Sequence, residues 1–204
     1  VVVIEDIGTE RQSMRHLPFG FYDPPRGVSG GSIAALAFDT RGNLWIGATD
    51  GAITVYETAA GTYSHLRPNA DNPVEGTHGW TVWSLTALPD GDMWIFQKNA
   101  FERWDADSQR IVERYAPSDG DTLGYTGTNV FASLLDSRGT LWLGTGDGLL
   151  RRDPGKRRFT RYEGSLEDTT TLSVNSVKAV FEDSRGDIWV GTEGGGVCHF
   201  DRRS

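Results

Sequence analysis

Few side chains in this sequence have types and spacing that could carry out a reaction. Cys198 and His199 are adjacent, and a thiol beside an imidazole can act as a nucleophile and its base. Their apolar neighbours indicate a strand, however, and successive side chains of a strand point to opposite faces. His16 and His65 fall at equivalent places in two predicted strands and are expected to face outward. His78 lies in a predicted loop, EGTHGWTVW, and no catalytic residue is expected.

Short acidic segments could bind a cation. Asp105 with Asp107, and Asp119 with Asp121, form carboxylate pairs of the kind that supply oxygen ligands to Ca²⁺. Neither pair has the full spacing of a calcium loop, and acidic turns are common without a metal. We therefore expect turns here, with no bound metal and no cofactor.

The charge balance argues against nucleic acid as a partner. The chain has 20 Lys and Arg residues against 28 Asp and Glu residues, a net charge of -8. Binding a phosphate backbone requires clustered cations that release counterions. The dense basic run RRDPGKRRFTR, from Arg151 to Arg161, is interpreted as a hairpin with solvated faces, and an anion site is the less favoured alternative.

Length and composition favour one folded domain. A chain of 204 residues can bury a sizeable core, and the lone Cys198 cannot form an internal disulfide. No apolar run approaches the roughly 18 residues of a membrane span, so no membrane contact is expected for this segment. The opening VVVIED lacks a basic region and a cleavage site, which suggests a removed leader or an excised segment.

A repeated pattern must position all of these residues. Aligning RGNLWIGATDG, DGDMWIFQKNA, RGTLWLGTGDG and RGDIWVGTEGG superposes four tryptophans that are 49, 48 and 47 residues apart. A glycine lies three residues before each tryptophan, and an aspartate lies six residues before three of them. The second copy has Leu88 there and places its acid at Asp90. The repeated residues are Trp45, Trp94, Trp142, Trp189, Gly42, Gly91, Gly139, Gly186, Asp39, Asp136 and Asp183.

Each copy contains four short runs rich in β-branched and aromatic residues, separated by turn residues, and this pattern predicts four antiparallel strands. We name them a, b, c and d. In the third full copy they are expected at about 129–135, 140–144, 148–152 and 158–162. The turn DSRG joins a to b, because Asp accepts a backbone hydrogen bond and Gly permits positive φ.

Four strands in about 48 residues, repeated in tandem, are typical of a β-propeller blade. We therefore predict an all-β fold with about four blades' worth of strands, belonging to a larger ring. The tryptophan serves as a wedge between sheets, so the repeat is structural rather than chemical. The exposed edges of the partial blades suggest a larger ring or completion by a second copy. The predicted units are 1–31 (partial), 32–79, 80–127, 128–173 and 174–204 (partial).

The copy VKAVFEDSRGDIWVGTEGGGVCHFD (177–201) and the linker EGSLEDTTTLSVNSV (163–177) resemble two-component regulator propeller repeats. The resemblance covers essentially the whole chain and is weakest in the second copy, which has Phe96 and Gln97 in place of Gly and a small residue. It implies a seven-bladed type of propeller in the periplasmic part of bacterial sensors. Those sensors are histidine kinases, hybrid kinases or diguanylate cyclases that often respond to polysaccharide breakdown products.

Candidate ligand-binding residues come from the long d-to-a loops and from the start of strand a, because loops carry function on a rigid scaffold. Eleven residues before each motif tryptophan the sequence varies as Ala34, Trp83, Phe131 and Lys178. Aromatic faces there suit sugar rings or a partner protein, although they could equally pack beneath the loops. The candidates are Tyr22, His78, Trp80, Trp83, Tyr125, Phe131 and Lys178.

The leading hypothesis is a non-catalytic, extracytoplasmic ligand-sensing or interaction propeller of a bacterial signal-transduction receptor. Its ligand would be an oligosaccharide or another small molecule, and its protein partners would be neighbouring propeller domains or a second copy of the chain. Two alternatives stay open: a polysaccharide lyase or hydrolase on a propeller scaffold, and a structural spacer.

Overall fold

The computed structural model describes the backbone of residues 2–6 and 12–16. It describes backbone and side chains in 31–66, 81–98, 100–116, 124–125, 129–165, 167–168 and 170–202. Every regular element within these ranges is a β-strand, and every strand pair is antiparallel. The all-β fold expected from the repeat is confirmed.

The strands form a series of sheets in which neighbours in sequence are neighbours in space. A two-stranded sheet contains β1 (Val2–Asp6) and β2 (Gln12–His16). The first sheet contains β3 (Ile33–Phe38), β4 (Leu44–Ala48), β5 (Ile53–Glu57) and β6 (Thr62–Leu66). The second contains β7 (Val82–Ala87), β8 (Met93–Gln97), β9 (Ala100–Asp105) and β10 (Arg110–Tyr115). The third contains β11 (Val130–Leu135), β12 (Leu141–Thr145), β13 (Gly148–Arg152) and β14 (Thr160–Tyr162). The fourth contains β15 (Val177–Glu182), β16 (Ile188–Thr192) and β17 (Gly196–Phe200).

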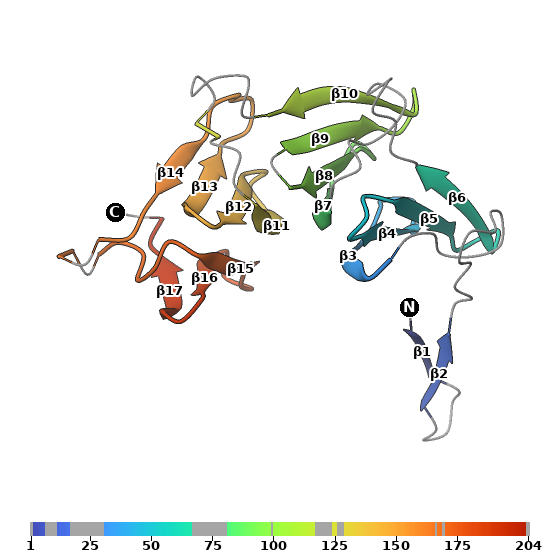
Figure 1. Ribbon diagram of the computed structural model, residues 1–204, viewed down its shortest axis with the longest axis horizontal. Coiled ribbons are helices and arrows are strands. Elements are labelled where there is room, and N and C mark those ends of the chain that lie inside the picture. Colours follow the sequence, from blue (N-terminus) through green and yellow to red (C-terminus); the bar gives the residue numbers. More distant parts are fainter. Residues whose placement is uncertain are drawn as a thin grey trace.

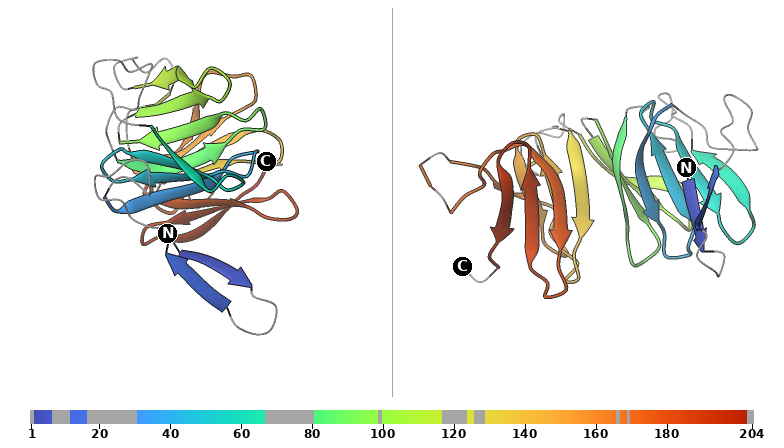
Figure 2. Two further views of the ribbon diagram at one scale, coloured as in Figure 1. Left: turned by 90° about the vertical axis from the view of Figure 1, so that its right-hand side faces the viewer. Right: turned by 90° about the horizontal axis from the view of Figure 1, so that it is seen from below.

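The four larger sheets stand side by side in an arc (Figures 1 and 2). Strands β3, β7, β11 and β15, which open the four sheets, line the inner side of the arc and contact one another in that order. Strands β6, β10 and β14 lie on its outer side. This is the arrangement of propeller blades around an axis, with strand a of each sheet innermost.

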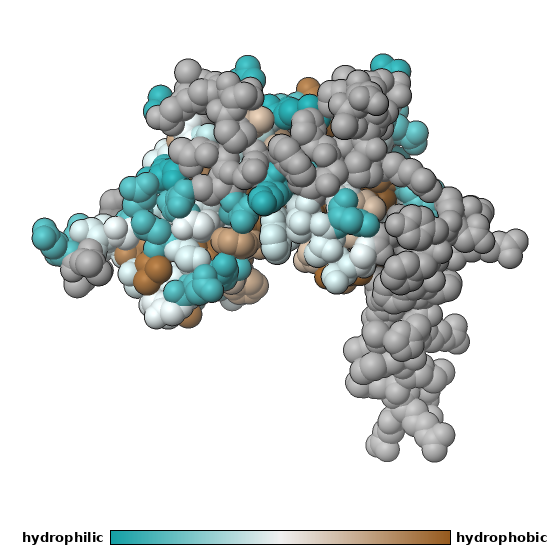
Figure 3. All heavy atoms as spheres, in the orientation of Figure 1, coloured by the Kyte–Doolittle hydropathy of each residue, from teal (hydrophilic) through white to brown (hydrophobic). Residues whose placement is uncertain are grey.

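The repeated tryptophans fill the spaces between sheets. Trp45, Trp94 and Trp142 each pack against the apolar face of the following sheet, and each exposes 5% of its surface or less. Burying a large ring between two sheets stabilises their contact. Trp189 is 40% exposed, because no described sheet covers its face of the fourth sheet. In Figure 3 apolar surface is visible over this sheet, at the lower left.

The aspartate of the repeat does more than stabilise a turn. Asp136 Oδ1 accepts hydrogen bonds from the backbone N–H groups of Arg138 (2.9 Å) and Thr140 (2.8 Å), while Oδ2 accepts from Trp142 Nε1 (2.7 Å). The carboxylates of Asp39 and Asp183 hold Trp45 (3.1 Å) and Trp189 (3.0 Å) in the same way. One carboxylate therefore fixes both the turn and the orientation of the wedge.

Candidate functional site

Three of the predicted ligand-binding residues lie side by side on the inner strands. The rings of Trp83 and Phe131 meet edge to face, with centroids 5.9 Å apart, and Lys178 Nζ lies 3.4 Å from the Phe131 ring centroid. Their equivalent positions at the start of β7, β11 and β15 bring them together, because these strands are neighbours. With Glu193 they form what we call the inner strip.

The inner strip combines apolar faces with polar groups. Lys178 Nζ lies 3.2 Å from Glu193 Oε2, and Ser176 Oγ donates a hydrogen bond to the same oxygen (2.9 Å). The hydrogen bond from Ser176 and then the ammonium of Lys178 lower the pKa of Glu193 below its usual value. The indole N–H of Trp83 is buried and has no acceptor in the described part of the chain. The strip thus offers ring faces, a cation and a carboxylate, while the Trp83 donor is buried.

The turns around the inner strip identify its end of the propeller. Glu193 belongs to the turn between β16 and β17, and Gly146, in the turn between β12 and β13, lies close to the Phe131 ring. In an antiparallel sheet alternate turns lie at opposite ends of the strands. The b-to-c turns therefore share this end with the d-to-a connections, and we call it the loop face. The candidates Tyr22, His78 and Trp80 lie outside the described residues.

Hydroxyl groups join the inner strands beneath the strip. Ser133 Oγ of β11 lies 2.6 Å from Ser84 Oγ and 2.5 Å from Thr86 Oγ1, both on β7. These contacts satisfy polar groups that are half-buried or buried where two strands approach closely. They hold in register the strands that carry Trp83 and Phe131.

Tyr125 is placed differently from the other described candidates. Its ring is buried with 3% exposure and meets Phe101 edge to face at a centroid distance of 4.9 Å. Burial also raises the pKa of its hydroxyl. Tyr125 is therefore one of the aromatic residues that pack in the interior, and it belongs to the core between the second and third sheets.

The groups considered for catalysis or metal binding are dispersed. Cys198 packs toward the third sheet, whereas the His199 ring lies 4.8 Å from the Trp189 ring on the other face, as strand alternation predicts. His65 does not face outward as expected: it is half-buried, with Nδ1 3.2 Å from the buried Thr54 Oγ1. Within the described ranges no three His, Cys, Asp or Glu side chains gather as a metal site would require.

The acidic pairs behave as turns where they are described. Asp105 Oδ1 accepts hydrogen bonds from the backbone N–H (2.7 Å) and hydroxyl (2.6 Å) of Ser108, and Asp107 pairs with Arg41 at 3.4 Å. These hydrogen bonds lower the pKa of Asp105. The second pair, Asp119 and Asp121, lies outside the described residues.

Sheets of sequential antiparallel strands arranged around an axis define the class of protein as a β-propeller. Residues 124–147 and 171–194 match the Two component regulator propeller family. Two stretches of the chain therefore match the repeat family that the sequence analysis named. Curated proteins give no significant sequence match.

Solved propellers with low sequence identity share the fold. One is the extracellular domain of BT3049 of B. thetaiotaomicron, classed as a hybrid two component system (TM-score 0.72, 16% identity, 94% of this chain and 25% of that one). Another is the extracellular domain of BT4673 of the same organism, classed as a one component system (0.67, 18%, 93% and 23%). A third is a catalytically inactive virginiamycin B lyase from Staphylococcus aureus with quinupristin (0.64, 15%, 100% and 64%).

This chain spans about a quarter of the length of the two B. thetaiotaomicron domains that it resembles. The chain contains two matches to two-component regulator propeller repeats and is similar in fold to extracellular domains of signalling systems. Its described residues include no helix long and apolar enough to cross a membrane.

Proposed function

We propose that this chain is a non-catalytic, ligand-sensing propeller in the periplasmic part of a bacterial signalling receptor. Its family and its likeness to extracellular domains of signalling systems support this setting. The observation that carries the proposal is the inner strip, where Trp83, Phe131 and Lys178 come together at the loop face. A few convergent polar groups beside aromatic surface are characteristic of ligand sites.

The chemistry of the inner strip suits an oligosaccharide. Ring faces pack against the apolar faces of sugars, while the Lys178 ammonium and the Glu193 carboxylate can hydrogen-bond to hydroxyl groups. Because the strip spans three sheets, a bound ligand would contact all three at once. A ligand with higher affinity for one arrangement of neighbouring domains would shift the receptor toward that arrangement.

The proposed protein partners are neighbouring propeller domains or a second copy of the chain. The face of the fourth sheet that is turned away from the third sheet exposes Phe181 (64%), Trp189 (40%) and Val197 (70%). The equivalent face of the third sheet, which includes Trp142, is covered by the fourth sheet and supplies the internal comparison. A further sheet would bury these apolar groups in the same way.

Thermal unfolding with a panel of oligosaccharides tests the ligand proposal. At about 100 times the Kd, binding adds about 2.7 kcal/mol, which raises the Tm of a protein of this size by roughly 5–10 °C. Phe131→Ala should abolish the rise, whereas Phe181→Ala, which removes an exposed ring from the fourth sheet, should preserve it.

Two results would contradict the sensing proposal. A wild-type Tm unmoved by every sugar in the panel would favour the structural spacer. Cleavage of a polysaccharide by the protein, lost in His78→Ala, would instead favour the lyase or hydrolase.

A further inference from the structure

The second sheet lacks a carboxylate that the other three sheets provide. Asp39, Asp136 and Asp183 each accept the indole N–H of their tryptophan, but Leu88 stands at the equivalent position beside Trp94. Trp94 as a residue is 99% buried, yet it lines a cavity, and no hydrogen bond joins its N–H to a described residue. This N–H can therefore donate to an acceptor from outside the chain.

The guanidinium group of Arg152 lies beside Trp94, where a carboxylate could bind both the guanidinium and the indole N–H. The carbon Cζ of Arg152 is 4.9 Å from the centroid of the Trp94 ring, and its Nη1 donates to the Tyr115 hydroxyl at 2.9 Å. The corresponding position in the other sheets is aromatic, at Tyr56, Trp104 and Phe200. An arginine has therefore replaced a ring at the one tryptophan of the repeat motif that has no aspartate.

The neighbouring interface shows the complete arrangement. Between the third and fourth sheets, Asp136 Oδ2 accepts from Trp142 Nε1 and from Arg202 Nη2, both at 2.7 Å. The Arg202 guanidinium lies 5.9 Å from the Trp142 ring centroid. Indole N–H, carboxylate and guanidinium thus form one unit there. Beside Trp94 the indole and the guanidinium are present, but the aspartate of the repeat is replaced by Leu88; the carboxylate of Glu113 lies 4.0 Å from Arg152 Nη1.

A cavity of about 330 Å³ opens at this place, between the second and third sheets. Trp94 and Arg152 line it, together with Leu88 and with Lys156 and Arg157 from the turn between β13 and β14. Its volume lies at the lower end of the range for small-ligand pockets, about 300–1,000 Å³. The cavity can therefore hold a molecule the size of one or two sugar rings.

The cavity carries surplus positive charge. Two of its acids are already paired: Asp90 with Arg103 (2.7 Å) and Asp153 with Arg151 (2.8 Å). The third acid, Glu113, accepts from the Tyr115 hydroxyl and lies 4.0 Å from Arg152 Nη1. Lys156 and Arg157 are exposed, and Arg157 hydrogen-bonds to the Tyr115 side chain. Neither is in an ion pair with a described acidic side chain, so an anion entering the cavity would meet two cations.

We propose that this cavity binds the carboxylate group of a small organic acid, such as an acidic sugar. The ligand carboxylate takes the place that Asp136 occupies in the next interface, accepting from Trp94 Nε1 and from Arg152. Lys156 and Arg157 attract it to the cavity. Part of the basic run from Arg151 to Arg161 thereby forms an anion site rather than only a solvated hairpin.

This carboxylate site is independent of the inner strip. It is lined by a-to-b and c-to-d turns, which lie at the opposite end of the strands from the loop face. If neutral oligosaccharides failed to bind the inner strip, the proposal of a carboxylate site would not be affected. Conversely, a negative result at the carboxylate site would not contradict the proposed sensing function.

The test follows the indole N–H signals of the ¹⁵N-labelled protein by NMR. Trp94→Phe identifies the Trp94 signal by its disappearance. Glucuronate should shift that signal saturably, while glucose, the neutral match, should leave it unchanged. Changing both Lys156 and Arg157 to Gln should weaken binding about tenfold or more, a loss of about 1.4 kcal/mol.

A variant at position 88 gives the sharpest control. Leu88→Asp supplies the missing carboxylate from within the chain, so the Trp94 signal should already be displaced and glucuronate should no longer bind. Leu88→Asn removes the same leucine without adding charge and should retain binding. The pair separates loss of the leucine from occupation of the site.

Three outcomes would overturn the carboxylate site. The Trp94 signal could stay unmoved by glucuronate, or it could respond equally to glucose. Sulfate or phosphate could shift it at concentrations at which glucuronate and acetate do not, which would exclude a carboxylate site. Undiminished glucuronate binding by Leu88→Asp would show that the ligand lies elsewhere.

Discussion

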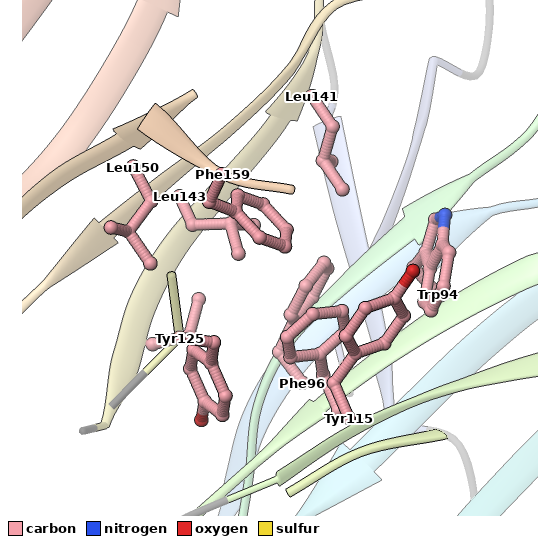
Figure 4. Close-up of a cluster of buried hydrophobic side chains, with 10 residues drawn as sticks. Trp94, Phe96, Tyr115, Tyr125, Leu141, Leu143, Leu150 and Phe159 are labelled. Atoms are coloured by element: carbon pink, nitrogen blue, oxygen red, sulfur yellow. The ribbon is translucent and has the colours of Figure 1, made fainter. Parts of the chain in front are cut away.

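Two neighbouring interfaces in this propeller bury the same tryptophan in different ways. Between the third and fourth sheets, Trp142 is held by Asp136, whose carboxylate also binds Arg202. Between the second and third sheets, Trp94 lies in an aromatic cluster (Figure 4), where the Phe101 and Tyr115 rings stack at 4.4 Å. Both tryptophans are 1% exposed. Equal burial is thus reached with and without a polar anchor.

A second substitution accompanies the loss of the anchor. Gly144, two residues after Trp142, allows the fourth sheet to approach so closely that an added Cβ would lie 2.7 Å from Val177 Cγ1. The equivalent residue after Trp94 is Phe96, which is fully buried among the aromatic rings. One interface is therefore a close contact fixed by hydrogen bonds. The other is built from bulky rings and leaves a cavity at its edge.

The largest expected difference is between Trp142→Phe and Trp94→Phe. Trp142→Phe removes a hydrogen bond to a buried carboxylate, so it should cost about 2–4 kcal/mol of unfolding free energy. Trp94→Phe removes no bond to a carboxylate and should cost about 1–2 kcal/mol. Chemical denaturation of both variants measures the difference. Equal losses would show that the Asp136 anchor contributes nothing beyond ring burial.

The close contact at Gly144 should be the next most sensitive feature. Gly144→Ala should destabilise the protein by about 1–3 kcal/mol, because overpacking forces Val177 to shift. Gly146→Ala is the matched control, since its added Cβ would meet nothing nearer than 3.8 Å. Denaturation midpoints of the two variants should therefore differ. Similar midpoints would mean that the third and fourth sheets can separate without cost.

The smallest expected effect is a loss of folding stability at acidic pH. Burial by itself raises the pKa of Asp136, but hydrogen bonds from Trp142, Thr140 and Arg138 and the charge of Arg202 outweigh it and leave the pKa below the ordinary 3.8. Ionised Asp136 therefore stabilises the fold above about pH 3.8, and this contribution is lost as the pH falls through the lowered folded-state pKa.

Asp136→Asn tests that linkage. At neutral pH the variant should be about 1–2 kcal/mol less stable than the wild type, and the gap should narrow in acid, where both side chains are neutral. Urea unfolding across the acid range measures the gap. A gap that stays constant with pH would mean that the charge of Asp136 does not contribute.

Much of the fold could be predicted because it depends on interactions within one copy of the repeat. Strand alternation, the Asp-Gly turn and the spacing of Trp142 from Asp136 involve residues only a few positions apart. The expected strand at 148–152 coincides with β13, Gly148–Arg152. The outer strand expected at 158–162 is shorter, at Thr160–Tyr162.

The candidate sites depended on how one sheet meets the next. Variation at equivalent positions selected Trp83, Phe131 and Lys178, but only neighbouring inner strands bring them into contact. The same variation in the loops selected Tyr125, whose ring the sheet contacts bury. Sequence variation does not distinguish an exposed aromatic ring from a buried one.

The cavity beside Trp94 was visible in the sequence only as two unrelated departures from the repeat, Leu88 for aspartate and Arg152 for an aromatic residue. The sequence by itself determined the propeller, its wedges and its turns, because these arise from short-range hydrogen bonds and alternation. The tertiary structure alone decided that the two departures meet. They lie in different sheets, 64 residues apart, and only the contact between those sheets places a guanidinium beside an indole without its carboxylate.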